Sequence, residues 1–222
     1  MTDEARSTMV ERTIAARGIT GEAVLDAFRF VPREKFVSSE MVEFAYDDSA
    51  LPIEEGQTIS QPYVVAVMTE ALEIGDGDRV LEIGTGSGYG AAILGRVAHE
   101  VWSIERHRPL AEKARARLED LGYDNVHVVV GDGTLGWPDA APFDAISVTA
   151  GGPNVPRHLT DQLVDGGRLV IPVGGQDREQ RLVRLRRQGD DLIDEELGAV
   201  RFVPLIGEHG WVEGAEGHPG GR

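Results

Sequence analysis

Three segments near the start of the chain carry apolar residues at the spacing of an α-helix. They are residues 2–17, 21–30 and 62–73. Gly18 follows the first segment and Pro32 lies just past the second, and both residue types commonly end helices. The pattern therefore predicts a helical N-terminal part.

From residue 79 onward, short apolar runs alternate with helical patterns. The predicted strands are residues 79–84, 101–105, 126–130, 143–149 and 168–174, and the clearest helices between them are 89–98 and 109–121. Strands joined by helical crossovers indicate a mostly parallel sheet with helices on both faces, the doubly wound α/β class. Residues 181–187 alternate apolar and charged side chains, as a half-exposed strand does.

These elements fit a single domain over residues 1–210. Within it we expect a helical part over residues 1–75 and a cofactor-binding core over residues 76–210. Residues 211–222 are rich in glycine and charge, which predicts a flexible tail.

The composition excludes several kinds of site. The chain has no cysteine, so it has no disulfide, thiolate metal site or cysteine nucleophile. Its six histidines have no ligand-like spacing, and we expect no metal site. No apolar run is long enough to span a bilayer, and no basic-then-apolar leader opens the sequence. We therefore expect a cytoplasmic protein without membrane contact.

The charge of the chain is strongly negative. It carries 38 acidic against 22 basic residues, a formal net charge of −16, and its only lysines are Lys35 and Lys113. Such a surface repels nucleic acid, because phosphate binding depends on lysine and arginine. Two interpretations of the charge remain: an ordinary acidic protein, or one adapted to a salt-rich cytoplasm, where screening reduces self-repulsion.

Three glycines follow the first predicted strand. In EIGTGSGYG, residues 82–90, Gly84, Gly86 and Gly88 lie between that strand and a helix. Glycine permits a tight turn and the close approach of a ligand, which indicates a nucleotide-cofactor loop at the carboxyl edge of the sheet. Gly86 and Gly88, with Ala91 three residues further on, also satisfy the dinucleotide fingerprint, so this pattern alone leaves NAD open.

Acidic residues on three successive strands favour S-adenosyl-L-methionine over NAD. Glu82 lies in the first strand, where it can face an ammonium or sulfonium group. Glu105 ends the second strand, within reach of ribose hydroxyls, and Asp132 follows the third, within reach of an adenine amino group. No Gly-Lys-Ser/Thr follows the glycines, so a phosphate-binding loop is not supported.

A second motif lies upstream and is more specific than the glycines. It is TISQP within GQTISQPYVVAVM, residues 56–68. The chain continues with VLEIGTGSGYGAA, then GDGTLGWPDAAPFDAISVTA, GGRLVIPVG and VRFVPLIG. This ordered set, over roughly residues 25–207, resembles the protein-L-isoaspartate O-methyltransferase family.

The resemblance implies a Rossmann-like S-adenosylmethionine-dependent methyltransferase fold and a repair reaction. The family methylates the α-carboxyl of isoaspartyl residues in damaged proteins and peptides, and the ester closes to a succinimide that opens in part to aspartate. With the reasoning above, the expected cofactor residues are Glu82, Gly84, Gly86, Gly88, Glu105, Asp132 and Gly133. The substrate residues that the resemblance implies are Thr58, Ile59 and Ser60, with Ser60 as the catalytic residue.

The chain departs from the family pattern at two places. Gly90 stands where the family commonly has glutamine, and Gly151-Gly152 replace a pair usually built of alanines. We expect these glycines to make their loops more flexible. We also expect the enzyme to act as a single chain.

Ser60 has two interpretations. Serine is a favoured helix N-cap, but proline prefers the first helical position, so Pro62 would make Gln61 the cap and leave Ser60 outside the helix. We therefore favour contact with the substrate. A carboxylate is already ionised at neutral pH, so its methylation needs alignment by hydrogen-bond donors and no general base.

Two other classes of function remain as alternatives. A small-molecule methyltransferase would keep the glycine loop and the acids but has no need of TISQP. A non-catalytic binding module would need no cofactor.

Overall fold

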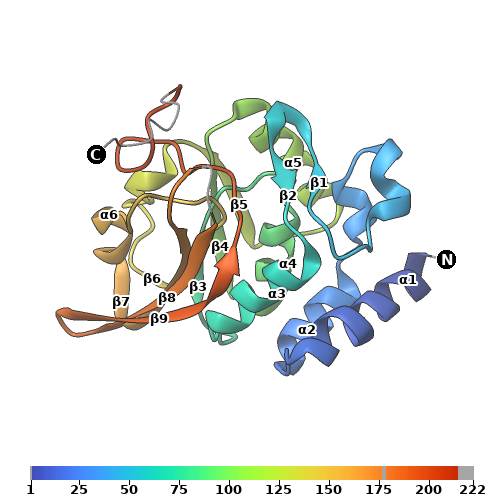
Figure 1. Ribbon diagram of the computed structural model, residues 1–222, viewed down its shortest axis with the longest axis horizontal. Coiled ribbons are helices and arrows are strands. Elements are labelled where there is room, and N and C mark those ends of the chain that lie inside the picture. The colour runs from blue at the N-terminus through green and yellow to red at the C-terminus, as the bar shows by residue number, and fades with distance from the viewer. Residues whose placement is uncertain (1, 177–178, 215–222) are drawn as a thin grey trace.

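A seven-stranded sheet forms the centre of the computed structural model, which describes residues 2–176 and 179–214. The strands are β3 (Arg79–Ile83), β4 (Glu100–Glu105), β5 (Val126–Val130), β6 (Phe143–Val148), β7 (Leu163–Val173), β8 (Gln180–Gln188) and β9 (Asp191–Val200). Their order across the sheet is β5-β4-β3-β6-β7-β8-β9 (Figure 1). The first five in this order pair in parallel, and β8 and β9 are antiparallel. The mostly parallel sheet predicted from the sequence is confirmed.

Helices cover both faces of this sheet. The helices of the core are α3 (Pro62–Ala71), α4 (Tyr89–Val97), α5 (Arg108–Asp120) and α6 (Arg157–Thr160). Successive side chains of a strand point to opposite faces, so Val80 packs in one layer with Leu72 and Leu94, whereas Leu81 packs in the other with Leu159 of α6. This division is the doubly wound arrangement.

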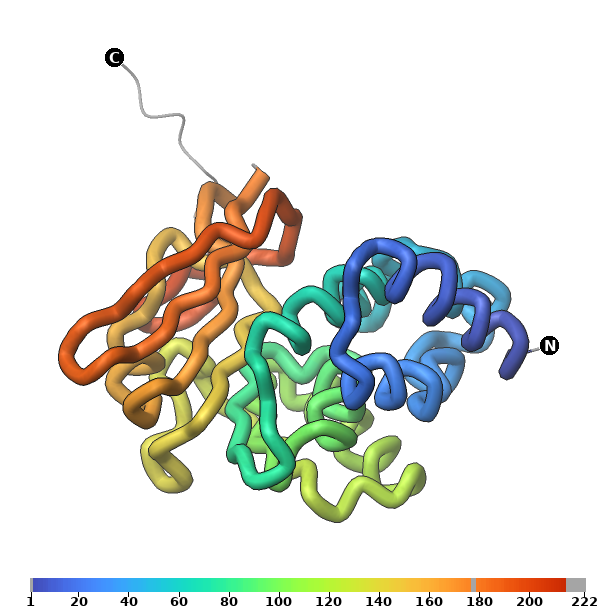
Figure 2. The backbone as a smooth tube through the Cα atoms, turned by 90° about the horizontal axis from the view of Figure 1, so that it is seen from below, coloured from blue at the N-terminus to red at the C-terminus, as the bar shows by residue number. Residues whose placement is uncertain are grey.

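The N-terminal part packs against α4. The predicted helix over residues 2–17 has the right span but consists of α1 (Thr2–Thr8), a π-helix (Met9–Ile14) and a 3₁₀-helix (Ala15–Arg17). Gly18, with φ of 100°, ends it, and α2 (Glu22–Phe30) follows. Figure 2 shows these helices on the side of the molecule opposite the β8–β9 hairpin. The ring of Phe28 meets the ring of Tyr89 edge-on, with 6.1 Å between centroids.

A small two-stranded hairpin precedes α3. Its strands are β1 (Leu51–Pro52) and β2 (Thr58–Ile59), and a 3₁₀-helix (Glu54–Gly56) lies between them. Further 3₁₀-helices are Arg33–Phe36, Ser39–Phe44 and Gly133–Leu135. None of these short elements was predicted from the sequence.

Two boundaries differ from the sequence prediction by more than one residue. Helix α3 ends at Ala71 instead of residue 73, and β7 begins at Leu163 instead of residue 168. The register of β7 shifts against β6 between Phe143 and Ala145, so β7 continues through its glycines. Strand β9 was missed, because its mostly exposed side chains mix apolar and acidic residues without regular alternation, and among the described strands it pairs only with β8.

The chain returns to the sheet after β9. In the predicted tail, Trp211 donates its backbone N–H to Leu205 O at 2.7 Å and its ring N–H to Gly151 O at 3.0 Å. Residues 215–222 of that tail lie outside the described residues. Within the described ranges, no helix has the length and apolar character to cross a bilayer, and no three His, Asp or Glu side chains are grouped as metal ligands.

Candidate cofactor and substrate site

The glycine turn joins β3 to α4 at the carboxyl end of the sheet. Gly84, Gly86 and Gly88 have φ angles of 95°, 53° and 92°. These values lie in the left-handed region, which glycine adopts at little cost. Gly88 is also the residue that caps the start of α4. The turn thus depends on glycine at each of the three predicted positions.

Glu105 ends β4 and faces this turn. Its carboxylate accepts the backbone N–H of Gly86 and of His107, each at 2.9 Å. The residue is 5% exposed. A carboxylate can accept about four hydrogen bonds, so Glu105 keeps acceptor capacity toward the space beside it.

That space is a cavity of about 320 Å³. Besides Glu105, it is lined by the predicted cofactor residues Gly84, Gly86 and Gly133 and by residues 203–206 of the C-terminal segment. Arg106 and Glu213 form an ion pair of 3.0 Å at its rim. The cavity therefore has acceptors for hydroxyl groups and an apolar wall from the C-terminal segment.

Glu82 lines a second, smaller cavity. It is 1% exposed, points toward α4, and accepts a hydrogen bond from Ser103 Oγ at 2.5 Å. Burial raises the pKa of Glu82 to about 8 despite this bond, and the nearby charge of Glu105 adds to the rise. The cavity beside Glu82 has a volume of about 60 Å³ and is also lined by Ser60, Gly84 and Gly90.

Asp132 is engaged with the C-terminal segment. Its carboxylate accepts the N–H and hydroxyl of Thr134 at 2.9 and 2.7 Å, and the N–H of Glu208 at 2.8 Å. Burial alone would raise the pKa of Asp132, but these hydrogen bonds outweigh it and lower this pKa. Gly133, not Asp132, lines the 320 Å³ cavity. The contact of Asp132 with an adenine amino group stays a prediction.

Ser60 lies one residue before the cap of α3. The structure has Gln61 as the N-cap and Pro62 as the first residue of the helix, as the proline argument predicted. Ser60 lines both the small cavity beside Glu82 and a separate groove of about 900 Å³. Ile59 is 4% exposed, pairs with Leu51 in the hairpin and lines the small cavity, but not the groove.

Two threonines lie where the three spaces meet. Thr58 and Thr149 line the groove, the small cavity and the 320 Å³ cavity. The hydroxyl of Thr149 lies 2.9 Å from Ile83 O and 2.8 Å from Gly84 O, which attaches the end of β6 to the glycine turn. A group bound beside Glu105 and a group bound in the groove would meet at these two side chains.

Sequence reasoning missed Thr149 and His107. Thr149 is the last residue of the predicted strand 143–149, and its place at the carboxyl edge of a parallel sheet was the available signal. His107 contributes mainly a backbone N–H, which no side-chain pattern reveals. The C-terminal wall, residues 203–206, comes from a segment more than 90 residues away from Glu105 in the chain, so no local pattern connects them.

The glycines that depart from the family pattern are tightly packed. A Cβ on Gly90 would lie 2.4 Å from Glu82 Oε1, and a Cβ on Gly151 would lie 2.3 Å from Gln180 Nε2. Gly90 lies within helix α4, so the expectation that it loosens a loop was wrong, and Gly151 donates its N–H to Val203 O at 2.8 Å. The side chains of Glu82 and Gln180 therefore occupy the positions where side chains on Gly90 and Gly151 would lie.

The chain is similar over most of its length to known proteins. The model of the family protein-L-isoaspartate(D-aspartate) O-methyltransferase matches residues 4–210. Protein-L-isoaspartate O-methyltransferase 2 of Pelobacter propionicus is 62% identical over 207 residues, which are 93% of this chain and 92% of that protein. The protein-L-isoaspartate O-methyltransferase of Brucella anthropi is 52% identical over 210 residues, 94% of this chain and 96% of that protein.

Solved structures give the same result. A protein-L-isoaspartate O-methyltransferase superposes with a TM-score of 0.84 at 33% identity, covering 95% of this chain and 67% of that one. A Plasmodium falciparum protein of the same description, solved with S-adenosyl-L-homocysteine, gives a TM-score of 0.76 at 25% identity, covering 90% and 97%.

Proposed function

The chain belongs to the protein-L-isoaspartate(D-aspartate) O-methyltransferase family, and we propose that the residues around Thr58 and Thr149 carry out the reaction of that family. The protein is an S-adenosylmethionine-dependent carboxyl O-methyltransferase that acts on isoaspartyl residues of damaged proteins. The observation that supports this assignment of residues is the meeting of three spaces at the two threonines.

The residues of the 320 Å³ cavity fit the cofactor. Glu105 keeps free acceptor positions for the two hydroxyls of a ribose, and Gly84, Gly86 and Gly133 line the same cavity. Glu82 lies on the far side of the glycine turn, where an acidic group can face a cationic amino acid. When bound, S-adenosylmethionine supplies a methyl group on a sulfonium sulfur.

The residues of the groove serve the substrate. The isoaspartyl carboxylate enters beside Ser60 and Thr58, whose hydroxyls donate hydrogen bonds that hold it in line with the methyl carbon. With S-adenosylmethionine bound, its sulfonium methyl group would pass to a carboxylate oxygen held by Ser60 and Thr58, which would give a methyl ester and S-adenosylhomocysteine. No proton is transferred, so the site needs alignment and no general base.

Ser60 is the catalytic residue in this proposal. Ser60→Ala should lower kcat with an isoaspartyl peptide and leave cofactor affinity nearly unchanged, because the proposed role of the hydroxyl is a hydrogen bond to the substrate carboxylate. Transfer of label from S-adenosylmethionine to the peptide and calorimetry with S-adenosylhomocysteine measure the two quantities. A variant with full turnover would exclude Ser60 from this role.

The choice of peptide separates the alternative functions. Labelling of an isoaspartyl peptide, with none of its aspartyl counterpart, is the expected result. Methylation of small carboxylates in preference to the peptide would indicate a small-molecule methyltransferase. Cofactor binding without transfer to any of these acceptors would indicate a binding module.

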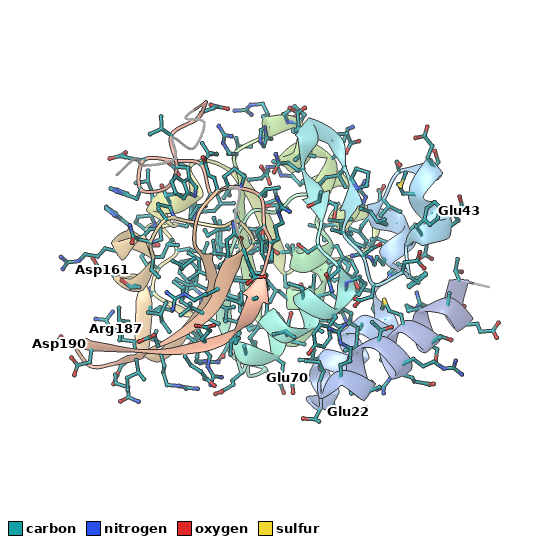
Figure 3. The ribbon with its side chains drawn as sticks, in the orientation of Figure 1. Glu22, Glu43, Glu70, Asp161, Arg187 and Asp190 are labelled. Atoms are coloured by element: carbon teal, nitrogen blue, oxygen red, sulfur yellow. The ribbon has the colours of Figure 1, made fainter. Side chains whose placement is uncertain are left out.

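The setting of the enzyme is a further part of the proposal. We infer one domain over residues 1–210 that works as a single chain in the cytoplasm, with the helical part contributing Ser60 and the core contributing the cofactor residues. Its acidic surface suits a salt-rich cytoplasm. Glu22, Glu43 and Asp190 lie at the outer edge of the molecule (Figure 3). Light scattering of the purified protein tests the single-chain state.

A further inference from the structure

The start of α3 is capped by a residue from another segment. Gln61, its N-cap, makes no capping hydrogen bond with its own side chain. Instead Asp48 Oδ1 accepts the N–H of Tyr63 at 3.0 Å, and Asp48 Oδ2 accepts a hydrogen bond from Gln61 Nε2 at 3.2 Å. A carboxylate at this point satisfies a free N–H of the first turn and faces the positive end of the helix dipole.

The same short segment holds the chain on the other side of Ser60. Leu51 pairs with Ile59, and Pro52 pairs with Thr58, in the β1–β2 hairpin. Ser60 therefore lies between two attachments, the ladder at Ile59 and the carboxylate at Gln61 and Tyr63. Both come from residues 48–52, and neither uses the Ser60 hydroxyl.

Asp48 is itself held by arginines. Arg17 Nη1 lies 2.7 Å from Asp48 Oδ2, and its guanidinium lies 3.3 Å from the centre of the Tyr63 ring. Arg33 is fully buried and donates to Ala45 O at 2.7 Å and to Ser49 O at 3.4 Å, on either side of Asp48. The positive charge of Arg17 also offsets a carboxylate that would otherwise repel an anionic substrate in the adjoining groove.

We propose that Asp48 is a positioning residue for methyl transfer, which fixes the main chain at Ser60 so that its hydroxyl meets the substrate carboxylate. This inference rests on the proposed role of Ser60. Catalysis by alignment is sensitive to small displacements, and a shift of about 1 Å can cost about 100-fold in rate. A carboxylate that orients the catalytic segment therefore affects kcat without touching the substrate.

Three substitutions test Asp48. Asp48→Ala removes the cap and should lower kcat with an isoaspartyl peptide by about 10- to 100-fold, with affinity for S-adenosylhomocysteine unchanged. Asp48→Asn keeps an oxygen that accepts the Tyr63 N–H and should restore most of kcat. Asp47→Ala, at the neighbouring exposed position, whose side chain makes no hydrogen bond in the described residues, is the matched control and should match the unmodified enzyme.

A double-mutant cycle separates positioning from general loss of structure. If Asp48 acts through Ser60, Asp48→Ala should have little further effect on kcat in the Ser60→Ala background. Additive losses, or equal loss of turnover and of S-adenosylhomocysteine affinity, would overturn the proposal. If Asp48→Ala does not fold, Asp48→Glu keeps the charge but displaces it, and full turnover in that variant would also overturn it.

The cycle also distinguishes this inference from the proposed function. Loss of turnover in Ser60→Ala together with full turnover in Asp48→Ala would exclude the positioning role of Asp48 and leave the role of Ser60 intact. Full turnover in Ser60→Ala would remove the role of Ser60 itself.

Discussion

Thr149 Oγ1 occupies the space that a side chain on Gly84 would need. A Cβ on Gly84 would lie 2.4 Å from that oxygen, well inside the contact distance of real Cβ atoms. The same hydroxyl lies 2.8 Å from Gly84 O, so the first glycine of the turn and the end of β6 are fitted to each other.

Gly84→Ala is therefore expected to destabilise the fold through two separate effects. The positive φ of 95° costs a non-glycine residue about 1–3 kcal/mol of unfolding free energy, and the contact with Thr149 adds to it. Thr149→Ala removes the contact, together with the hydrogen bonds of its hydroxyl to Ile83 O and Gly84 O. The double variant should thus lose less stability than the sum of the two single variants, as measured by urea denaturation, and strict additivity would contradict the contact.

Glu105→Ala should weaken cofactor binding. The carboxylate is the only charged acceptor predicted for the ribose hydroxyls, and hydrogen bonds to a charged group contribute about 1.5–3 kcal/mol. Calorimetric titration of the folded variant with S-adenosylmethionine measures this loss. Glu112→Ala, on the exposed side of α5, is the control and should bind normally. Unchanged affinity in Glu105→Ala would remove that residue from the site.

The regular part of the fold was predictable because its signals are local. β3 and β4 are buried apolar runs between turn residues, and the glycines after β3 indicate the loop that follows it. β9 was not predictable from its composition. Its exposed side chains bury little apolar surface, and it forms because β8 offers an unpaired edge.

Site residues were predictable only where they lie at the end of a predicted strand or within a recognisable motif. Glu105, the glycines and Ser60 fall in this class. Thr149 and the C-terminal wall join the site through the order of strands in the sheet, which a single sequence does not display. Asp132 was expected to face the cofactor, but its carboxylate also accepts the Glu208 N–H from a segment 76 residues further along the chain.

Glu82 should make stability depend on pH in an unusual direction. Burial raises its pKa from 4.5 to about 8 in the folded protein. Between these values the unfolded chain loses the proton and the folded chain keeps it, so the contribution of Glu82 to stability is full below about pH 4.5 and is lost as pH rises toward 8. Glu82→Gln cannot titrate.

The difference in unfolding free energy between Glu82→Gln and the unmodified protein should therefore grow from pH 4.5 to 8 and then level off. Urea denaturation at several pH values measures it. Glu119→Gln, at an exposed position on α5, is the control and should show no such growth. Parallel curves for Glu82→Gln and the unmodified protein would show that Glu82 is ionised in the fold.

Arg168 should contribute more to stability than Arg181 of β8. Its guanidinium donates to Leu72 O at 2.6 Å, to Glu73 O, and to Asp78 Oδ2 at 2.8 Å, which satisfies carbonyls at the end of α3. Arg168→Met should cost about 1.5–3 kcal/mol, because charged hydrogen bonds in a half-buried site are lost. Arg181→Met, whose partner Glu196 is exposed, should cost less than about 1 kcal/mol. Equal melting temperatures for the two variants would contradict this ranking.

The negative charge should make stability rise with salt. With a net charge of −16, repulsion acts across the whole molecule at low salt. The Debye length is about 30 Å at about 0.01 M salt and about 3 Å at about 1 M. The compact folded state suffers more from this repulsion than the unfolded chain. Salt also weakens exposed ion pairs, but each of these contributes little, so we expect the melting temperature to rise from low salt toward molar potassium chloride.

The β8–β9 hairpin provides a matched variant for the salt experiment. Asp190, Asp191 and Asp194 are exposed, and none of them forms an ion pair within the described residues. Replacing all three by asparagine removes three negative charges without removing a contact, so the triple variant should melt higher at low salt and respond less to potassium chloride. A melting temperature that stays constant or falls with salt in the unmodified protein would contradict the salt-adaptation proposal. It would leave the methyltransferase assignment unaffected, because that rests on the family match and the site.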